Sequence, residues 1–167
     1  IKDKHKILIF SSFKSAVYLV KEALDRESIS NYVIDGSVKG RDRVAMVDAF
    51  NKDKTNCFLI TLKSGGTGLN LTSADVVIHL DIWWNPQAEN QATDRAHRIG
   101  QTKKVTVLKL INKGTVEEKI IELQEKKKIL SDNLIEGKNV DTLEALTEEE
   151  LTNLLSIGYE TDHNNDK

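Results

Sequence analysis

Five short apolar runs divide the chain, and they constrain its fold more than any other feature. KILIF, CFLIT, DVVIHL and VTVLKLI are apolar nearly throughout, and Tyr32–Ile34 is a shorter run. The segments between them carry apolar residues at helical spacing, as Val17, Val20 and Leu24 do. Apolar strands that alternate with amphipathic helices are typical of βαβ units and a mostly parallel sheet. The predicted fold class is therefore α/β.

The same patterns place the individual elements. The expected strands are residues 6–10, 32–34, 57–61, 75–80 and 105–111. The expected helices are residues 11–27 with Ser11 or Ser12 as cap, 40–50 with Val44, Val47 and Phe50 inward, 86–99, and 115–134. Asn85 can cap the third of these helices, Pro86 suits its first position, and Gly100 can supply its left-handed C′ residue.

Composition and charge narrow the class of protein. The single cysteine, Cys57, lies in an apolar run, and the four histidines lack metal-ligand spacing, so no metal site is predicted. The chain shows neither a signal peptide nor a membrane span, and its first residue, Ile1, suggests a piece of a longer protein. Residues 1–113 hold 18 Lys and Arg against 12 Asp and Glu, whereas residues 114–167 hold 6 against 14. The basic body indicates either a solvated surface or a contact with nucleic acid.

Four polar segments follow the expected strands. They are SSF (11–13), DGSVKGR (35–41), LKSGGTG (62–68) and DIWWNP (81–86). Ligands of open α/β sheets bind beyond the carboxyl ends of the strands, so we expect these segments to lie along one edge. The glycines favour a tight turn, and Lys63 and Ser64 beside them favour backbone phosphate contacts. Lys39, Arg41 and Arg43 fit a solvated helix start or contacts with nucleic-acid phosphates.

Gln91, Arg95 and Arg98 are spaced i, i+4 and i+7, which predicts one helical stripe. Two guanidinium groups on one stripe repel each other unless an anion lies between them. The alternatives are a salt-bridged surface that includes Asp94, or a pair of donors for a transferring phosphoryl group. Two interpretations of Trp83 and Trp84 stay open: both pack structurally, or one of them stacks against nucleic acid.

In order and spacing, these motifs resemble the second RecA-like lobe of Swi/Snf-type DNA translocases, a branch of superfamily-two helicases. The matching stretches are KILIFSSF, DGSVKGRDRVAMVDAFN, LKSGGTGLNLTSADVVIHLDIWWNP and QATDRAHRIGQTKKV. The resemblance covers about residues 4–134, and WWNP and RAHRIGQ are its most specific pieces. It implies a RecA-like lobe over residues 1–134, whose helix 115–134 braces back across the lobes. Residues 135–167 would form an acidic extension, partly disordered, with a capping box at Thr147.

The resemblance also implies roles for individual residues. Arg95 and Arg98 would be arginine fingers, and Gln91, Gly66 and Gly68 would contact the nucleotide. The implied DNA contacts are Ser11, Ser12, Ser37, Arg43, Lys63, Ser64 and Gly65, with Trp84 as a candidate for stacking. Ser64 is a departure, because the family usually has alanine there. Standing alone, the lobe should leave Arg95 and Arg98 exposed to solvent or paired with carboxylates such as Asp94.

ATP and Mg²⁺ are the implied cofactors, and double-stranded DNA and a first RecA-like lobe are the implied partners. The chain has no Walker A sequence and no DE-x-x box, so the first lobe would hold ATP and Mg²⁺. We therefore expect the fragment alone to be inactive, and the whole protein to be an intracellular DNA-dependent ATPase. The competing hypotheses are a catalytically silent DNA- or protein-binding module and an RNA helicase lobe.

Overall fold

The structure is a computed structural model that describes residues 5–65, 68–83, 85–98 and 100–134. The chain divides into two compact units, Ile1–Leu110 and Ile111–Lys167, and each is described by itself. The predicted domain division at residue 134 and the capping box at Thr147 stay predictions, because residues 135–167 lie outside the described residues.

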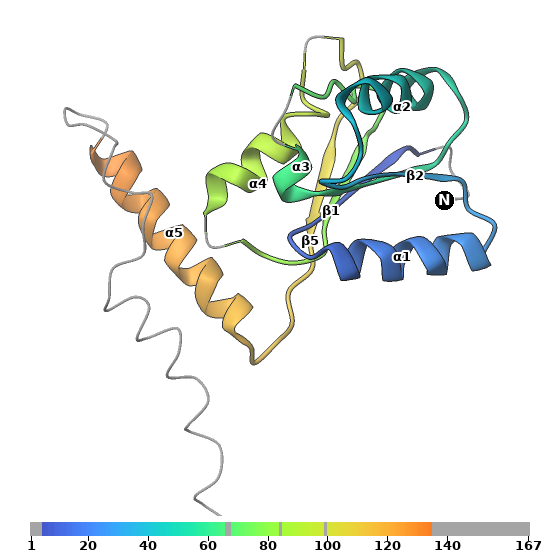
Figure 1. The fold of residues 1–167 in the computed structure, drawn as a ribbon. Coiled ribbons are helices and arrows are strands. Elements are labelled where there is room, and N and C mark those ends of the chain that lie inside the picture. The colour runs from blue at the N-terminus through green and yellow to red at the C-terminus, as the bar shows by residue number, and fades with distance from the viewer. Residues whose placement is uncertain (1–4, 66–67, 84, 99, 135–167) are drawn as a thin grey trace, which may run out of the picture. The chain divides into compact units, whose positions relative to one another are not determined.

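Strands and helices alternate along the chain (Figure 1). The strands are β1 Ile7–Ser11, β2 Asn31–Ile34, β3 Cys57–Thr61, β4 Val76–His79 and β5 Thr106–Lys109. The helices are α1 Lys14–Arg26, α2 Gly40–Lys52, α3 Leu62–Gly65, α4 Pro86–Thr93 and α5 Val116–Leu134. None of these helices is both long enough and apolar enough to cross a membrane, within the described part of the chain.

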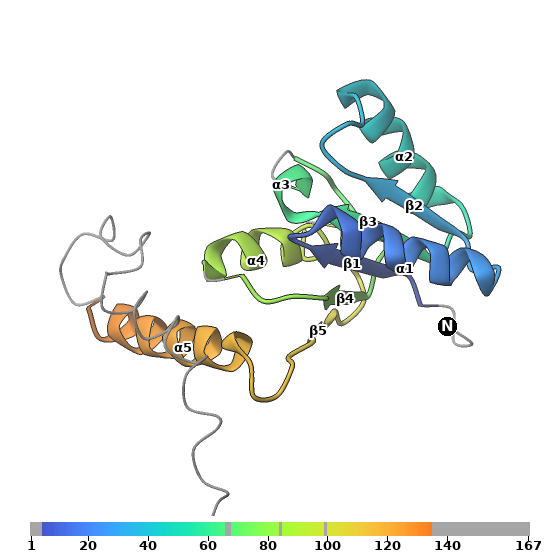
Figure 2. The same cartoon turned by 60° about the horizontal axis from the view of Figure 1, so that its bottom comes forward.

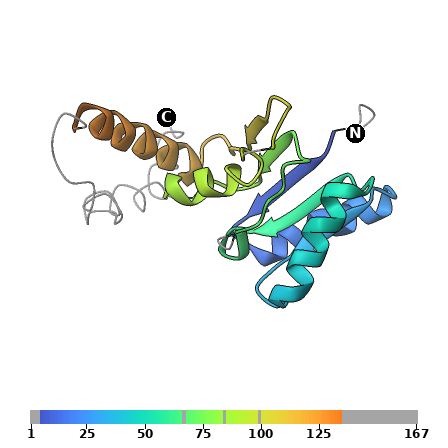
Figure 3. The ribbon, with the colours of Figure 1, turned by 90° about the horizontal axis from the view of Figure 1, so that it is seen from above.

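The five strands form one sheet in the order β2-β3-β1-β4-β5, and every pairing is parallel (Figure 2). Ile9 of β1 pairs with Leu59 of β3 on one side and with Ile78 of β4 on the other. The predicted α/β class with a mostly parallel sheet is confirmed. Because all strands point the same way, their carboxyl ends share one edge, which Figure 3 shows at the end near α3.

The two faces of the sheet pack against different helices. Val17 of α1 packs with Ile9 and Leu59 on one face. On the other face, Phe50 of α2 packs with Phe58, and Ala92 of α4 belongs to the same cluster. Burial of apolar side chains on both faces explains why β1 and β3 are apolar nearly throughout, whereas β5 at the edge of the sheet is exposed along its length.

Two local predictions were wrong. Val44 is 59% exposed, because the inward stripe of α2 runs through Arg43, Val47 and Phe50 instead. Neither serine caps α1: the N-cap residue is Phe13, which has no side-chain oxygen. Ser11 Oγ accepts a hydrogen bond from the Phe13 N–H at 3.0 Å and so turns the chain into the helix.

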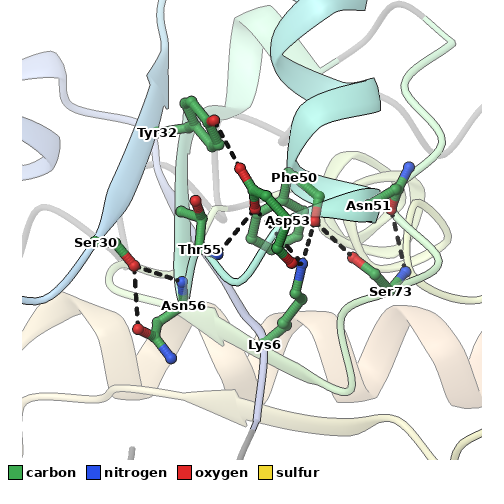
Figure 4. A network of polar contacts seen from close by, with 9 residues as sticks. All are labelled: Lys6, Ser30, Tyr32, Phe50, Asn51, Asp53, Thr55, Asn56 and Ser73. Carbon is green, nitrogen blue, oxygen red and sulfur yellow. Dashed lines mark hydrogen bonds and ion pairs between the residues drawn. The ribbon is translucent and has the colours of Figure 1, made fainter.

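A polar network joins the amino edge of the sheet to the C-terminal end of α2 (Figure 4). The Lys6 ammonium donates to the carbonyls of Phe50 and Asp53 at the end of α2, and it lies 4.6 Å from the Phe50 ring centroid. Tyr32 Oη donates to Asp53 Oδ2 at 2.8 Å. A cation at a helix C-terminus satisfies the free carbonyls there, so this network fixes α2 on the sheet.

In the second unit, α5 begins with a well-defined cap. The Glu117 N–H donates to Thr115 Oγ1 at 3.3 Å, and Glu118 accepts a hydrogen bond from the Gly114 N–H at 2.9 Å. Gly114 has φ +74°, a conformation that glycine adopts without strain. The expected helix after the fifth strand is confirmed.

Candidate nucleotide and nucleic-acid interface

The carboxyl edge of the sheet collects the segments that sequence analysis singled out. The four segments lie at or just after the carboxyl ends of β1, β2, β3 and β4, and these four strands are neighbours in the sheet. They are residues 11–13, 35–41, 62–68 and 81–86. The prediction that they share one edge is confirmed. Trp84, Gly66 and Thr67 of these segments lie outside the described residues.

Asp81 organises the turn after β1. Ser11 Oγ donates to Asp81 Oδ2, and the Ser12 N–H donates to Asp81 Oδ1 at 2.9 Å. Ser11 is buried, and its hydroxyl is occupied by Asp81 and by the backbone of Phe13. Ser12 Oγ is also buried, but it has no hydrogen-bond partner in the described part of the chain. Of the two serines, only Ser12 retains an unused hydroxyl.

Asp35 organises the turn after β2. Its buried carboxylate accepts hydrogen bonds from the Ser37 N–H at 2.8 Å and from Tyr18 Oη at 3.1 Å, and Lys14 Nζ lies 2.7 Å away. Lys14 first, and Ser37 after it, hold the pKa of Asp35 well below its ordinary value. The charged form of Asp35 therefore stabilises the turn that presents Ser37.

This pairing predicts a pH-dependent difference between the wild-type chain and Asp35→Asn. The folded-state pKa of Asp35 lies below the unfolded value of about 3.9, so its contribution is complete above that pH and declines as the pH falls through the folded pKa. At pH 7 we expect the variant to lose about 1–3 kcal/mol of unfolding free energy, because the donors around the buried side chain of residue 35 lose a charged acceptor. Urea denaturation should show that the gap narrows below about pH 4. A gap that is constant from pH 7 to pH 3 would contradict this account.

Arg43 of α2 joins the segment after β2 to the segment after β3. Nε donates to the Val38 carbonyl at 2.8 Å, and the terminal nitrogens donate to the carbonyls of Asp35 at 3.0 Å and Ser64 at 3.4 Å. The guanidinium group thus spans the turn after β2 and the helix after β3. Its predicted contact with DNA stays a prediction, and the contacts seen here give Arg43 a positioning role.

The segment after β3 begins as one helical turn, α3, rather than as a loop. Ser64 Oγ is buried and accepts a hydrogen bond from Thr61 Oγ1 at 2.8 Å, whereas Lys63 is exposed. The hydroxyl of Ser64 therefore faces the protein. Gly68 has φ +48°, so any other residue there would be strained, although the space beside it is open. Ser37, Lys39 and Arg41 are exposed as well.

The helix that carries Gln91 ends earlier than predicted. α4 stops at Thr93, and residues 94–98 form turns, with Arg95 N–H bonded to the Ala92 carbonyl at 3.2 Å. The Leu71 N–H donates to the Arg95 carbonyl at 3.0 Å, which ties the turn to the segment after the glycines. The predicted stripe of Gln91, Arg95 and Arg98 is therefore wrong as helix geometry. Gly100 does adopt a left-handed φ of +106°, but it does not follow the end of α4. The start of α4 is as predicted, since Asn85 Oδ1 accepts from the Gln87 N–H at 2.9 Å.

Arg95 and Arg98 have opposite environments. Arg98 is exposed as expected, but Arg95 is only 3% exposed, so the expectation of two exposed arginines was wrong for Arg95. Burial, and then the charge of Arg98, lower the pKa of Arg95 from its ordinary value, but an arginine stays charged at neutral pH. Arg95 Nε is buried and lacks a hydrogen-bond partner within the described ranges. None of the ion pairs among the described residues includes Arg95 or Arg98, so the pairing with Asp94 is not formed.

Sequence reasoning missed three carboxylates that shape this edge: Asp35, Asp81 and Glu89. The available signal was their position, directly after a strand for Asp35 and near one for Asp81, where an acidic residue meets free backbone N–H groups. As for metals, the described residues contain no cluster of three or more His, Cys, Asp or Glu that could hold one.

A comparison with protein families decides the classification. The model of the helicase conserved C-terminal domain matches residues 1–100, which is more than half of the chain. The chain belongs to the helicase conserved C-terminal domain family. Relatives of this helicase domain include an uncharacterized ATP-dependent helicase of Mycoplasma pneumoniae, 43% identical over 92% of this chain and 15% of the relative. The human chromatin-remodeling ATPase INO80 is 42% identical over 83% of this chain and 9% of the relative.

A solved structure has the same fold. The crystal structure of the C-terminal part of the Fun30 ATPase domain matches with a TM-score of 0.74 and 34% identity, over 92% of this chain and 46% of that one. The RecA-like fold and the resemblance to Swi/Snf-type C-terminal lobes are thus confirmed. This helicase domain spans 15% of the length of the first curated relatives that it matches.

Proposed function

We propose that this helicase domain is the second motor lobe of an ATP-dependent translocase on double-stranded DNA, and that Arg95 and Arg98 meet the phosphates of ATP held by a first lobe. The observation that carries the proposal is the state of Arg95: a buried guanidinium whose Nε has no partner in the described ranges. A buried charged donor without an acceptor costs free energy, and an anion supplied from outside the lobe would remove that cost. Relatives named as an ATP-dependent helicase and a chromatin-remodeling ATPase support ATP as that ligand.

The proposed roles fit the surroundings of the two arginines. Arg98 is exposed and can reach a ligand on a separate lobe, whereas Arg95 would have to turn outward from its buried position. Gln91 is exposed on α4 and can donate or accept at the same ligand. When bound, ATP with Mg²⁺ supplies the phosphoryl group that is transferred to water. The two guanidinium groups would stabilise the negative charge that develops on it. The Mg²⁺ would be held by the first lobe, and Gly68 and Gly66, the latter outside the described residues, would approach the nucleotide.

The DNA contacts belong to the carboxyl edge in this proposal. Several polar side chains are exposed on the segments that follow β2 and β3: Ser37, Lys39, Arg41 and Lys63. The unused hydroxyl of Ser12 lies close to the same edge. Such groups bind phosphate oxygens and carry no direct information about base sequence, which suits a motor that tracks along duplex DNA. Ser11, Ser64 and Arg43 are engaged with the protein itself and would act by holding these loops. The roles of Gly65 and Trp84 stay predictions.

The proposal is tested by the choice of nucleic acid that stimulates ATP turnover in the full-length protein. We expect duplex DNA to raise kcat for ATP at least about tenfold over duplex or single-stranded RNA at equal phosphate concentration. Equal stimulation by RNA would favour an RNA helicase lobe instead. Measurable DNA binding without any ATP turnover would favour a silent binding module.

A separate prediction concerns the 167-residue chain by itself. Because it lacks a Walker A sequence and a DE-x-x box, we expect phosphate release from ATP to stay at the level of a protein-free control, with or without duplex DNA. The measurement is a steady-state phosphate assay at high protein concentration. Turnover above the control that follows the protein through purification would contradict the division of labour between two lobes.

A further inference from the structure

Helix α4 contacts the sheet through polar side chains as well as through a small apolar surface. Its residues Glu89 and Ala92 are buried, and Ala96 beyond its end is buried too. The two alanine methyl groups bury little apolar area, so apolar packing contributes only weakly to the position of this helix. The polar contacts of Glu89 and Thr93 therefore contribute to the orientation of the helix.

The Glu89 carboxylate connects three segments. Oε1 accepts a hydrogen bond from the Trp83 N–H at 2.6 Å, which holds the loop after β4. Oε2 forms an ion pair with Lys109 Nζ on β5. Glu89 is only 1% exposed, and an ionised carboxylate at such a depth is retained only with partners of this kind.

A second polar contact lies beside the first. His79 and Lys109 are register partners on β4 and β5, so both side chains face α4. His79 Nε2 lies 3.1 Å from Thr93 Oγ1, at the last residue of α4, and the ring stacks on Phe10 at 5.6 Å between centroids. The middle and the end of α4 are thus joined to β5, to β4 and to the loop that follows β4.

We propose that Glu89 is a positioning residue: its pairing with Lys109 and with the Trp83 N–H sets the orientation of α4, and through α4 that of the turn that carries Arg95 and Arg98. This inference rests on the proposed function of the two arginines. A finger contributes to catalysis only when it is aligned with the transferring group, and a misplacement of about 1 Å can cost about 100-fold in rate. Glu89 itself touches neither the nucleotide nor the DNA.

The experiment uses ATP turnover by the full-length protein with saturating duplex DNA. Glu89→Gln keeps an acceptor for the Trp83 N–H but loses the charge that faces Lys109. We expect kcat to fall about 10- to 100-fold, with KM for ATP and the affinity for duplex DNA within about threefold of the wild type. Lys109→Arg keeps the ion pair and should retain most of the turnover. Glu22→Gln on the exposed face of α1 is the matched control and should change nothing.

Rescue separates positioning from loss of folding. The double variant Glu89→Gln with Lys109→Gln replaces the ion pair by two amides that can bond to each other. Its kcat should be at least about tenfold higher than that of Glu89→Gln alone. Amide hydrogen exchange of residues 86–93 reports on α4 directly and should accelerate in Glu89→Gln but not in the double variant. A kcat for Glu89→Gln within twofold of the wild type would overturn the inference. It would also be overturned if the decrease in kcat matched the fraction of unfolded protein and the double variant did not restore kcat.

The outcome for Arg98 keeps this inference distinct from the proposed function. If Arg98→Ala abolishes turnover while Glu89→Gln has no effect, the positioning role is overturned and the finger role stands. If Arg98→Ala leaves turnover intact, the finger role fails, and the positioning role fails with it.

Discussion

Arg98→Ala in the full-length protein is expected to lower kcat for ATP by about 10³-fold or more, with duplex-DNA affinity within about twofold of the wild type. An arginine that stabilises the transferring phosphoryl group contributes about 10³–10⁵ in rate, and Arg98 is the exposed member of the pair. The measurement is steady-state phosphate release beside a DNA-binding titration. Arg26→Ala, an exposed arginine at the far end of α1, is the matched control and should leave both values unchanged. Full turnover in Arg98→Ala would favour a binding module.

A second prediction concerns Arg95, whose replacement should affect stability and ATP turnover in opposite ways. Because its Nε is buried and unpartnered within the described residues, Arg95→Met should keep or raise the melting temperature of the 167-residue chain while it abolishes turnover in the full-length protein. A buried guanidinium nitrogen without an acceptor costs free energy, and its retention is consistent with a role in function. A variant that loses both stability and activity would instead assign Arg95 to the core.

Phe58→Ala is expected to have the largest effect on stability. Phe58 is fully buried in β3, meets the Phe50 ring edge-on at 5.1 Å between centroids, and lies 5.8 Å from the Tyr32 ring. Truncation of such a phenylalanine costs about 3–5 kcal/mol, a large part of the roughly 5–15 kcal/mol that holds a domain folded. Denaturant unfolding of the 167-residue chain measures the loss. Phe13→Ala makes the same change at a residue that is 60% exposed and should cost below about 1 kcal/mol; equal costs at both positions would contradict the assigned core.

The central strands β1 and β3 were predictable because burial on both faces leaves a continuous apolar signal. Cys57–Thr61 matches its predicted bounds, and Asn85 caps α4 through a local contact that a sequence shows. The end of α4 was not predictable in the same way. It depends on the Leu71 N–H, which reaches the Arg95 carbonyl from a segment more than twenty residues away. Helical spacing carries no trace of such a contact.

The candidate site shows the same division between local and distant effects. The segments at the carboxyl edge could be predicted, because a parallel sheet places strand ends together. Which side chains remain free at that edge could not be predicted. The hydroxyl of Ser11 is hydrogen-bonded to Asp81, and the hydroxyl of Ser64 is hydrogen-bonded to Thr61. Both hydrogen bonds depend on how the folded segments approach each other. The burial of Arg95 likewise follows from the turn after α4, which sequence periodicity represented as a longer helix.

The most direct test of the central claim compares the binding of two nucleotides to the full-length protein. ADP with aluminium fluoride mimics the transferring phosphoryl group, whereas ADP alone does not, and ligands that resemble the transition state bind more tightly. With duplex DNA and Mg²⁺ present, we predict that Arg98→Ala binds ADP like the wild type but loses most of the extra affinity for ADP with aluminium fluoride. If the variant retains that extra affinity in full, Arg98 does not reach the phosphates, and the composite site proposed here is wrong.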